Sequence, residues 1–347
     1  MTDVPELSGP DDPGSPFELA PGQANAIGRM LALLGDEWTL LLVREALLGA
    51  TRFSDFAHLP ISNAVLTTRL QALVRDGLLQ RQIYQQQPLR AGYLATPQCR
   101  QLWAVLVSIW QWERTWVDDH IDALPGMRHR TCGQDFAPVL TCGHCQTAAA
   151  VADIEARWGP SGSWQRSVPR ATTRRRLRSG AGQAGLFPQT MAIFGNRWSA
   201  AIIGAAFMGT RRFSDFQTRL DAPAALIAHR LKVFCEIGVL QAAAHPKRAD
   251  WNEYHLTPKG LAFYPVIATA IHWAQTNYTG GEGLALRQTH RRCGHDFVPQ
   301  LVCDQCATVL TADSIGVVPR RDEAVDLAGD AAPPSAPTAV RPRRDHR

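Results

Sequence analysis

The chain has 347 residues, enough for two or three domains that each bury their own core. Its formal net charge of +5 permits a nucleic-acid partner without requiring one. No apolar run approaches the roughly 18 residues that a membrane-spanning helix needs, and the acidic, proline-rich N-terminus is unlike a secretory signal. We therefore expect a cytoplasmic protein without a membrane partner. Its eight cysteines would stay reduced there, so closely spaced ones are more often metal ligands or redox sensors than structural disulfides.

The first predicted elements are three helices. Apolar residues recur at helical spacing over 38–48, and a short helix follows in RFSDFAHLP. Ser62 or Asn63 is suited to cap a third helix over 64–76. The leucines of this third helix share one face, which predicts that its polar residues point outward.

A hairpin and a terminal helix follow. The extended segments LLQRQIY and RAGYLAT predict a β-hairpin, and Thr96-Pro97 is typical of the start of a helix. That helix is rich in tryptophan from Trp103 to Trp116, which favours a core or dimer face, with an effector pocket as the alternative. A winged helix-turn-helix has its elements in this order: three helices, a hairpin and a terminal helix.

The chain consists of two similar halves. LGDEWTLLLVREALLGATRFSDF, from Leu34, aligns with FGNRWSAAIIGAAFMGTRRFSDF, from Phe194, at an offset of 160. Further on, TRLQALVRDGLLQ aligns with HRLKVFCEIGVLQ at an offset of 161, and two cysteine motifs follow at the same offset. Self-similarity over this length indicates a duplication with one inserted residue.

Composition predicts the domain boundaries. The stretch from Arg157 to Gly185 is rich in Gly, Ser, Pro and Arg, as solvated linkers are. The predicted fold class is mainly α with small β-hairpin wings, as two winged helix-turn-helix domains that are each followed by a small zinc-binding module. The predicted order is disordered residues 1–20, winged helix 21–125, module 126–156, linker 157–185, winged helix 186–285, module 286–317 and disordered tail 318–347.

Both halves contain the same ordered set of motifs. The motifs in the first copy are GDEWTLLLVREALLGATRFSDF, then VLTTRLQALVRDGLL, a hairpin with Tyr84, Pro88, Arg90 and Tyr93, and a helix beginning at Thr96-Pro97. The second copy is similar through GNRWSAAIIGAAFMGTRRFSDF, LIAHRLKVFCEIGVL and YHLTPKG. In this order the motifs resemble the HxlR family of bacterial winged-helix transcriptional regulators, and the resemblance covers roughly residues 24–120 and 186–280.

The resemblance implies a sequence-specific DNA-binding regulator, which we expect to be a repressor. The third helix, about 62–76, is implied to enter the major groove, and the wing at 81–95 to follow the DNA backbone. Family members usually work as homodimers, so this chain is expected to be a homodimer or its own intrachain pseudo-dimer. An unknown small-molecule or redox effector is a further expected partner.

Polar residues on and near both recognition helices are the predicted contacts to double-stranded DNA. Base edges are read by side chains with donors and acceptors, and phosphates by cations and hydroxyls. The second copy replaces most of these with apolar residues, and Glu236 stands in place of Arg75, so we expect the first copy to read most of the sequence. The predicted contacts are Arg52, Ser62, Asn63, Thr67, Thr68, Arg69, Arg75, Arg90, Arg212, His229, Arg230, Lys247 and Arg248.

The run RATTRRRLR at 170–178 is the densest positive charge in the chain. A solvated linker is the usual explanation of such a run. The alternative is a flexible arm that lies along phosphates or enters the minor groove.

Two cysteine motifs share the spacing HxxCx9CxxC: HRTCGQDFAPVLTCGHC at 129–145 and HRRCGHDFVPQLVCDQC at 290–306. A CxxC pair on a tight turn gives two thiolates to a tetrahedral ion, and an HxxC pair can supply the other two ligands. This spacing predicts two structural Zn²⁺ ions per chain. We expect one site from His129, Cys132, Cys142 and Cys145, and the other from His290, Cys293, Cys303 and Cys306.

Two alternatives remain open for these motifs. The CxxC thiols could form a reversible disulfide that senses oxidants and releases zinc. His144 could be the fourth ligand in place of His129, although the second copy has Gln305 at that position. Cys99 and Cys235 do not recur and are expected to pack in cores. An apolar cover for the modules is expected from Asp135, Phe136, Pro138 and Leu140 and their counterparts Asp296, Phe297, Pro299 and Leu301.

No enzyme is predicted. The chain has no GxSxG, phosphate loop, dinucleotide fingerprint or HExxH, and a metal with four protein ligands is closed to substrate. The remaining alternative to a regulator is a scaffold whose degenerate winged helices bind protein rather than DNA.

Overall fold

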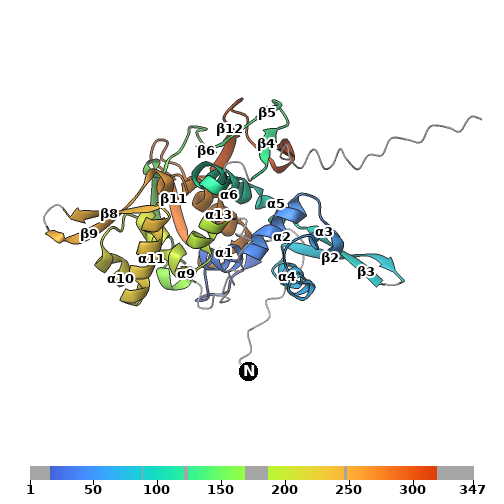
Figure 1. Cartoon of the computed structure of the whole chain (residues 1–347), viewed down its shortest axis with the longest axis horizontal. Coiled ribbons are helices and arrows are strands. Elements are labelled where there is room, and N and C mark those ends of the chain that lie inside the picture. The colour runs from blue at the N-terminus through green and yellow to red at the C-terminus, as the bar shows by residue number, and fades with distance from the viewer. Residues whose placement is uncertain (1–15, 88, 121–123, 169–186, 246–247, 319–347) are drawn as a thin grey trace, which may run out of the picture.

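The computed structural model of the chain describes residues 16–87, 89–120, 124–168, 187–245 and 248–318. Two winged helices lie at opposite ends of the long axis, and the cysteine-rich strands lie on one side between them (Figure 1). Within these ranges no helix is long and apolar enough to cross a membrane. The predicted fold class, mainly α with two winged helix-turn-helix units, is confirmed.

From residue 37 onward the first winged helix follows the predicted order, with boundaries within one residue of those expected for the helices at 38–48 and 64–76. It begins with a further helix that was not predicted. Its elements are α1 (Ala26–Leu34), α2 (Glu37–Leu47), α3 (Phe53–Phe56), α4 (Asn63–Arg75), β2 (Leu79–Gln86), β3 (Leu89–Ala95), α5 (Pro97–Gln101) and α6 (Trp103–Trp116). Asn25, Ser62 and Thr96 cap α1, α4 and α5, because each side-chain oxygen accepts a hydrogen bond from an amide of the first turn. The predicted long terminal helix is broken at Leu102 into α5 and α6.

The second winged helix repeats this plan with a weaker start to its recognition helix. Its elements are α8 (Pro188–Phe194), α9 (Arg197–Phe207), α10 (Phe213–Leu220), α11 (Ala224–Glu236), β8 (Leu240–His245), β9 (Arg248–Leu256), α12 (Pro258–Leu261) and α13 (Tyr264–Asn277). Pro223 occupies the N-cap position of α11 and offers no side-chain cap, whereas Ser62 caps α4.

Each wing is an antiparallel hairpin tied at its root to the loop after the second helix. The amide of Tyr93 in β3 donates to Thr51 O at 2.7 Å, and Tyr254 in β9 donates to Arg211 O at 2.8 Å. Each hairpin also has one irregularity in register, after Ile83 in the first wing and near its tip in the second. The wings are thus fixed to the loops between α2 and α3 and between α9 and α10.

The two halves pack through their terminal helices, α6 and α13. Trp112 Nε1 donates to Lys259 O at 3.0 Å, and Trp273 Nε1 donates to Gln98 O at 2.9 Å. The two bonds are equivalent, because Trp273 and Lys259 are the repeat counterparts of Trp112 and Gln98. The halves therefore meet through the same surface on both sides, as subunits of a two-fold dimer do.

A buried carboxylate adds a contact that the repeat does not duplicate. Glu113 in α6 is fully buried, and its Oε1 accepts a hydrogen bond from Thr190 N at 2.8 Å. Its Oε2 lies 3.0 Å from His120 Nδ1. The counterpart of Glu113 is Ala274, so this link between the halves exists once.

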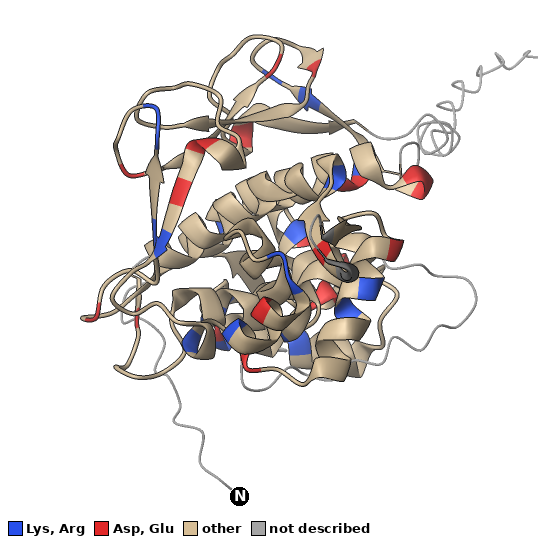
Figure 2. Cartoon of the chain, turned by 90° about the vertical axis from the view of Figure 1, so that its left-hand side faces the viewer, with Lys and Arg blue, Asp and Glu red and all other residues tan. Residues whose placement is uncertain are grey.

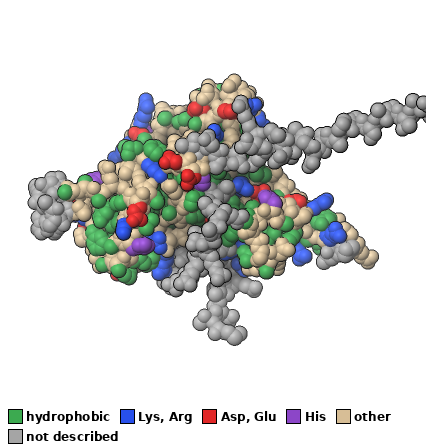
Figure 3. Space-filling view, viewed as in Figure 1, with side chains coloured by type: hydrophobic (Ala, Val, Ile, Leu, Met, Phe, Trp, Pro, Cys, Tyr) green, Lys and Arg blue, Asp and Glu red, His purple; other side chains and the backbone are tan. Residues whose placement is uncertain are grey.

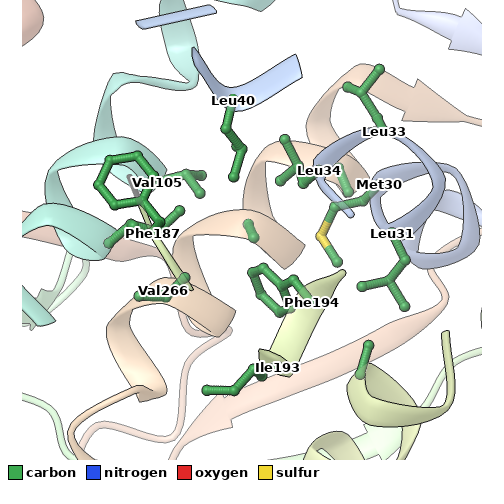
Figure 4. Packing of buried hydrophobic residues seen from close by; sticks show 14 of the residues in the cluster. Met30, Leu31, Leu33, Leu34, Leu40, Val105, Phe187, Ile193, Phe194 and Val266 are labelled. Carbon is green, nitrogen blue, oxygen red and sulfur yellow. The ribbon is translucent and has the colours of Figure 1, made fainter. Parts of the chain in front are cut away.

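One hydrophobic core runs through both winged helices. Figure 4 shows Met30 and Leu34 of α1 in the same cluster as Phe194 of α8 and Val266 of α13. All four side chains are buried. Because apolar side chains of each half complete the core of the other, neither half is an independent folding unit in this structure.

The cysteine-rich modules exchange strands to form one layer. Their strands are β4 (Gly126–His129), β5 (Gln134–Asp135), β6 (Pro138–Cys142), β7 (Ile154–Trp158), β11 (Leu286–His290), β12 (Pro299–Cys303) and β13 (Ile315–Val318). β4 pairs with β13, β7 with β11 and β6 with β12, each time across the halves and antiparallel. This layer packs on α6 and α13, and Figure 2 shows strands on one side of the helices. Its core contains Phe136, Leu140, Phe297 and Leu301, as the sequence predicts, whereas Asp135 and Asp296, which were expected in the same cover, are exposed.

The structure corrects two domain boundaries. Residues 16–20 belong to the fold, because β1 (Phe17–Glu18) pairs in parallel with β10 (Tyr278–Thr279). The predicted linker begins too early, since α7 (Trp164–Ser167) packs on α1 and Asn25 Nδ2 donates to Ser167 Oγ at 2.9 Å. Composition failed here because Gly and Ser also suit tight, buried turns. The rest of that linker, including 170–178, and residues 1–15 and 319–347 lie outside the described residues.

We expect Glu113→Ala to lower the free energy of unfolding by roughly 3 kcal/mol, because it leaves a buried amide and His120 without their acceptor. Thr115→Ala on the same helix is the control, since Thr115 is exposed and bonds only its own helix. Urea unfolding followed by circular dichroism measures both. Equal, small losses in the two variants would contradict the role given to Glu113.

Candidate metal centres and DNA-facing surface

Four tight turns hold the histidines and cysteines of the two motifs. In the HxxC turns, the amides of Gly133 and Gly294 each donate at 2.8 Å to the carbonyl of the histidine four residues earlier. Both glycines have positive φ, +71° and +72°, a backbone conformation that glycine adopts without strain. The CxxC turns close in the same way at Gln146 and Ala307, which also adopt left-handed conformations.

The turns meet in two clusters that each take ligands from both halves. One cluster joins the first-half HxxC turn to the second-half CxxC turn, and the other joins the remaining two turns. In each cluster the four ligand atoms lie within 4.8 Å of one another. The two sets are His129, Cys132, Cys303 and Cys306, and Cys142, Cys145, His290 and Cys293.

The predicted grouping of ligands within one motif is therefore wrong, although all eight predicted residues take part. The reason is the pairing of β6 with β12, in which Cys142 lies opposite Pro299 and Cys303 lies opposite Pro138. Antiparallel pairing places the two CxxC turns at opposite ends of this ribbon. Each CxxC turn therefore lies beside the HxxC turn of the other half and not beside the HxxC turn of its own half.

The distances in each cluster fit a tetrahedral metal ion. Zn–S bonds of about 2.3 Å and Zn–N bonds of about 2.0 Å imply S···S and S···N separations of about 3.8 and 3.5 Å. In the first cluster, Cys132 Sγ lies 4.0 Å from Cys303 Sγ, and His129 Nδ1 lies 3.3 Å from the sulfurs of Cys132 and Cys306. Three thiols and one imidazole at such spacing can hold a metal ion.

The imidazoles of both clusters point the same ring nitrogen at the sulfurs. His290 Nδ1 lies 3.3 Å from the sulfurs of Cys145 and Cys293, which repeats the arrangement around His129. Both histidines are fully buried, and their Nε2 atoms have no hydrogen-bond partner among the described residues. The Nδ1 atoms are therefore the ones placed to ligate a metal.

Two thiols are made more acidic by the turns that carry them. Hydrogen bonds from the hydroxyl and the backbone amide of Thr147 lower the pKa of Cys145 to about 6. Thr308 lowers the pKa of Cys306 to about 6 in the same way. Because thiolates are the ligands of metal ions, these threonines favour the binding form near neutral pH. The sequence repeats this Thr two residues after the CxxC, so its role could have been found there.

The other cysteines and His144 lie outside the clusters. The His144 ring stacks on that of His295 with centroids 3.5 Å apart, so the alternative in which His144 is the fourth ligand is not supported. Cys99 is fully buried, as expected, and burial raises the pKa of its thiol to about 12. Cys235 is only partly buried on α11.

On α4, three of the predicted DNA contacts form an exposed polar face. Asn63, Thr67 and Thr68 are exposed, and the two threonine hydroxyls donate to the carbonyls four residues earlier at 2.8 and 2.9 Å. Each hydroxyl keeps its lone pairs for an outside donor. Ser62 is also exposed and serves as the N-cap.

Arg69 has a structural partner that the sequence did not suggest. Its Nη1 lies 3.1 Å from Asp36 Oδ2, and its side chain is only 20% exposed, so it ties α4 to the start of α2. In the second copy the aspartate becomes Asn196, and the counterpart Arg230 has a buried Nε without a hydrogen-bond partner among the described residues. Burial lowers the pKa of Arg230.

The remaining predicted cations of the first copy lie around α4 and its wing. Arg52 is exposed, and its guanidinium lies 5.4 Å from the centre of the Tyr84 ring in β2. Arg75 is exposed at the end of α4, and Arg90 is exposed on β3. Arg81, exposed on β2, is a cation of the same wing that sequence reasoning missed.

In the second copy the matching surface is more apolar. Pro223, Ala224 and Ala228 are exposed at the start of α11, and His229 beside them is polar and exposed. Hydrophobic side chains gather over the α10–α11 end of the molecule (Figure 3). Arg212 lies 3.5 Å from Glu253 at the root of the wing. Arg248 lies in β9, while Lys247 lies outside the described residues.

Comparison with known proteins agrees with this architecture. The HxlR-like helix-turn-helix family matches twice, at residues 33–121 and 193–281. An uncharacterized HTH-type transcriptional regulator of Mycobacterium tuberculosis H37Rv is 36% identical over 143 residues, which are 40% of this chain and 88% of the relative. The uncharacterized HTH-type transcriptional regulator YvaP of Bacillus subtilis is 34% identical over 88 residues, 25% of this chain and 82% of the relative.

A solved structure is also similar in sequence. It is a candidate transcription factor, PA1374, from Pseudomonas aeruginosa, 28% identical, and the match covers 48% of this chain and 99% of that one. The TM-score is 0.27, so the overlap of the two structures supports no argument about overall shape.

The family and the relatives are helix-turn-helix transcriptional regulators rather than enzymes, which agrees with the two winged helices and their exposed recognition helices. The matched segments together make up about half of the chain. The chain therefore belongs to the HxlR-like helix-turn-helix family, with two copies of the family's domain in one polypeptide.

Paired cysteine substitutions test how the ligands are grouped. Because Cys132 and Cys303 belong to one cluster, the double variant Cys132→Ser/Cys303→Ser should lose one metal ion per chain and keep the other. Cys132→Ser/Cys145→Ser changes one thiol in each cluster and should lose both. Elemental analysis of the purified variants measures this, and the reverse pattern would show that each motif binds its metal alone.

Proposed function

We propose that the protein is a sequence-specific repressor that places α4 in the major groove of its operator and the β2–β3 wing on the DNA backbone. The observation that carries this proposal is the exposed face of Asn63, Thr67 and Thr68, three side chains with hydrogen-bonding groups on the helix that the resemblance implies enters the major groove. Repression would follow from occupation of the operator, which a reporter gene under that operator can measure.

The two winged helices are proposed to contribute unequally. On α11, apolar residues replace the reading face, and Glu236 replaces Arg75 at the end of the helix. An apolar side chain can contact a thymine methyl group but cannot tell apart most base edges, and a carboxylate repels phosphate. The second winged helix would therefore contribute weak affinity for DNA, and the first would determine which base sequence is bound.

The two metal clusters are proposed to hold Zn²⁺ as structural ions. Three thiolates and one imidazole in a closed tetrahedron are the donors that zinc prefers, and no position is left for a substrate. The ions would link strands from both halves and so stabilise the arrangement of the two winged helices. Reduced thiols of this kind suit the cytoplasm, which we propose as the location.

Substitution of the reading face should weaken specific binding. We expect Thr67→Ala/Thr68→Ala to reduce affinity for a fragment of the chain's own upstream region about tenfold or more, since each lost base contact costs about 1–3 kcal/mol. The helix should remain intact, because the two hydroxyls bond only to their own helix. Gel-shift titration at moderate salt, with random DNA as competitor, measures the change.

His229→Ala is the matched control, since His229 is the counterpart of Thr68 in the second copy. We expect little change in its affinity. If His229→Ala abolished binding while the threonine variant bound normally, the unequal roles proposed for the two copies would be reversed.

The contribution of Arg75 should appear in the salt dependence of binding. If Arg75 contacts a phosphate, Arg75→Ala should reduce the slope of log affinity against log salt by about 1, for specific and random DNA alike. Arg128→Ala, in β4 of the layer formed by the cysteine-rich modules, is the control for a general change in charge. Fluorescence anisotropy over a range of salt concentrations gives both slopes, and equal slopes would remove Arg75 from the interface.

A further inference from the structure

A large cavity lies between the second winged helix and the parts of the chain that cover it. Its volume is about 760 Å³, within the range of pockets that hold drug-sized molecules. Its walls come from α1, α7, α9, α13 and the β7–β11 ribbon. Both halves of the chain, together with the segment that follows the first metal module, therefore enclose it.

Comparison of the repeats explains why the space is there. On α9, Ala200, Ala201 and Gly204 line the cavity, and their counterparts on α2 are Leu40, Leu41 and Arg44. A Cβ built on Gly204 would meet only two ring atoms of Trp164, both at 3.6 Å. The second copy has small side chains where the first has large ones.

The walls of the cavity are mainly aromatic and aliphatic. The indoles of Trp158 and Trp164 meet edge to face with centroids 5.0 Å apart, and Phe207 and Tyr264 pack 5.8 Å apart on another wall. Flat aromatic rings pack well against such surfaces. The expected occupant is therefore a molecule with an aromatic body of two or three fused rings.

Polar groups in the cavity can bind a negatively charged oxygen of a ligand. The Tyr264 hydroxyl accepts a hydrogen bond from Gln288 Nε2 at 3.1 Å, and its own proton has no acceptor among the described residues. At the edge, Arg211 adds a guanidinium that also contacts His255, 2.9 Å away, at the root of the second wing. A buried hydroxyl donor and a cation at the edge both favour an oxygen acceptor with negative charge.

We propose that this cavity is a binding site for a small aromatic carboxylic acid. The ligand's rings would lie against Trp158, Trp164 and Phe207, and its carboxylate would accept from Tyr264. Because the cavity reaches the root of the second wing, its occupation would alter the position of that wing. This effect on DNA rests on the proposed function, whereas binding of the acid does not.

Titration calorimetry of the full chain with 2-naphthoate, without DNA, tests the proposal. We expect one molecule bound per chain, with affinity at least tenfold weaker for the uncharged 2-naphthalenemethanol. Tyr264→Phe should weaken 2-naphthoate binding about fivefold, the loss typical of one hydrogen bond. Absence of binding at millimolar 2-naphthoate, or equal binding of the two compounds, would overturn it.

Two leucine variants separate this cavity from general binding to apolar surface. Gly204→Leu should fill the space and reduce affinity more than tenfold, and its fold should hold because leucine favours a helix more than glycine does. Arg44→Leu introduces the same side chain at the matching position of the first copy and should bind 2-naphthoate as tightly as the unaltered chain does. Circular dichroism checks the fold of both, and unchanged binding by folded Gly204→Leu would show that the cavity is not the site.

Discussion

The packing of α6 against α13 is the contact on which the rest of the structure depends. It joins two copies of one domain through the same surface of each, and it carries the layer of exchanged strands on its outer side. The equivalent bonds from Trp112 and Trp273 fix the relative position of the helices. These helices also hold the two modules side by side, where each CxxC turn meets the HxxC turn of the other half.

Sequence reasoning predicted the local structure well, because local structure here follows from caps, apolar spacing and glycine. Ser62 and the leucines of α4 were enough to place the recognition helix, and the motifs were enough to name all eight candidate metal ligands. The partners of those ligands could not be predicted. Both groupings satisfy the same spacing in sequence, and only the pairing of β6 with β12, a long-range contact, distinguishes them.

The same limit applies to the surface proposed to bind DNA and to the cavity. The sequence predicts that Arg69 contacts DNA from the recognition helix. Its ion pair with Asp36 could not be predicted, because it depends on how α2 and α4 pack. The substitution of Leu40 and Leu41 by alanines in the second copy is visible in the alignment. The alignment does not reveal that α7 bounds the resulting cavity, because the sequence around α7 has the composition of a linker.

The duplication within one chain has a consequence for the DNA it can recognise. A homodimer presents two identical reading helices and so requires a palindromic site, whereas the two halves of this chain have been free to change separately. With an exposed polar face on α4 and an apolar one on α11, the preferred site is expected to be lopsided, with one well-defined half. Because the halves are covalently joined, dilution of the protein cannot separate them, and binding to DNA needs no prior association of two subunits.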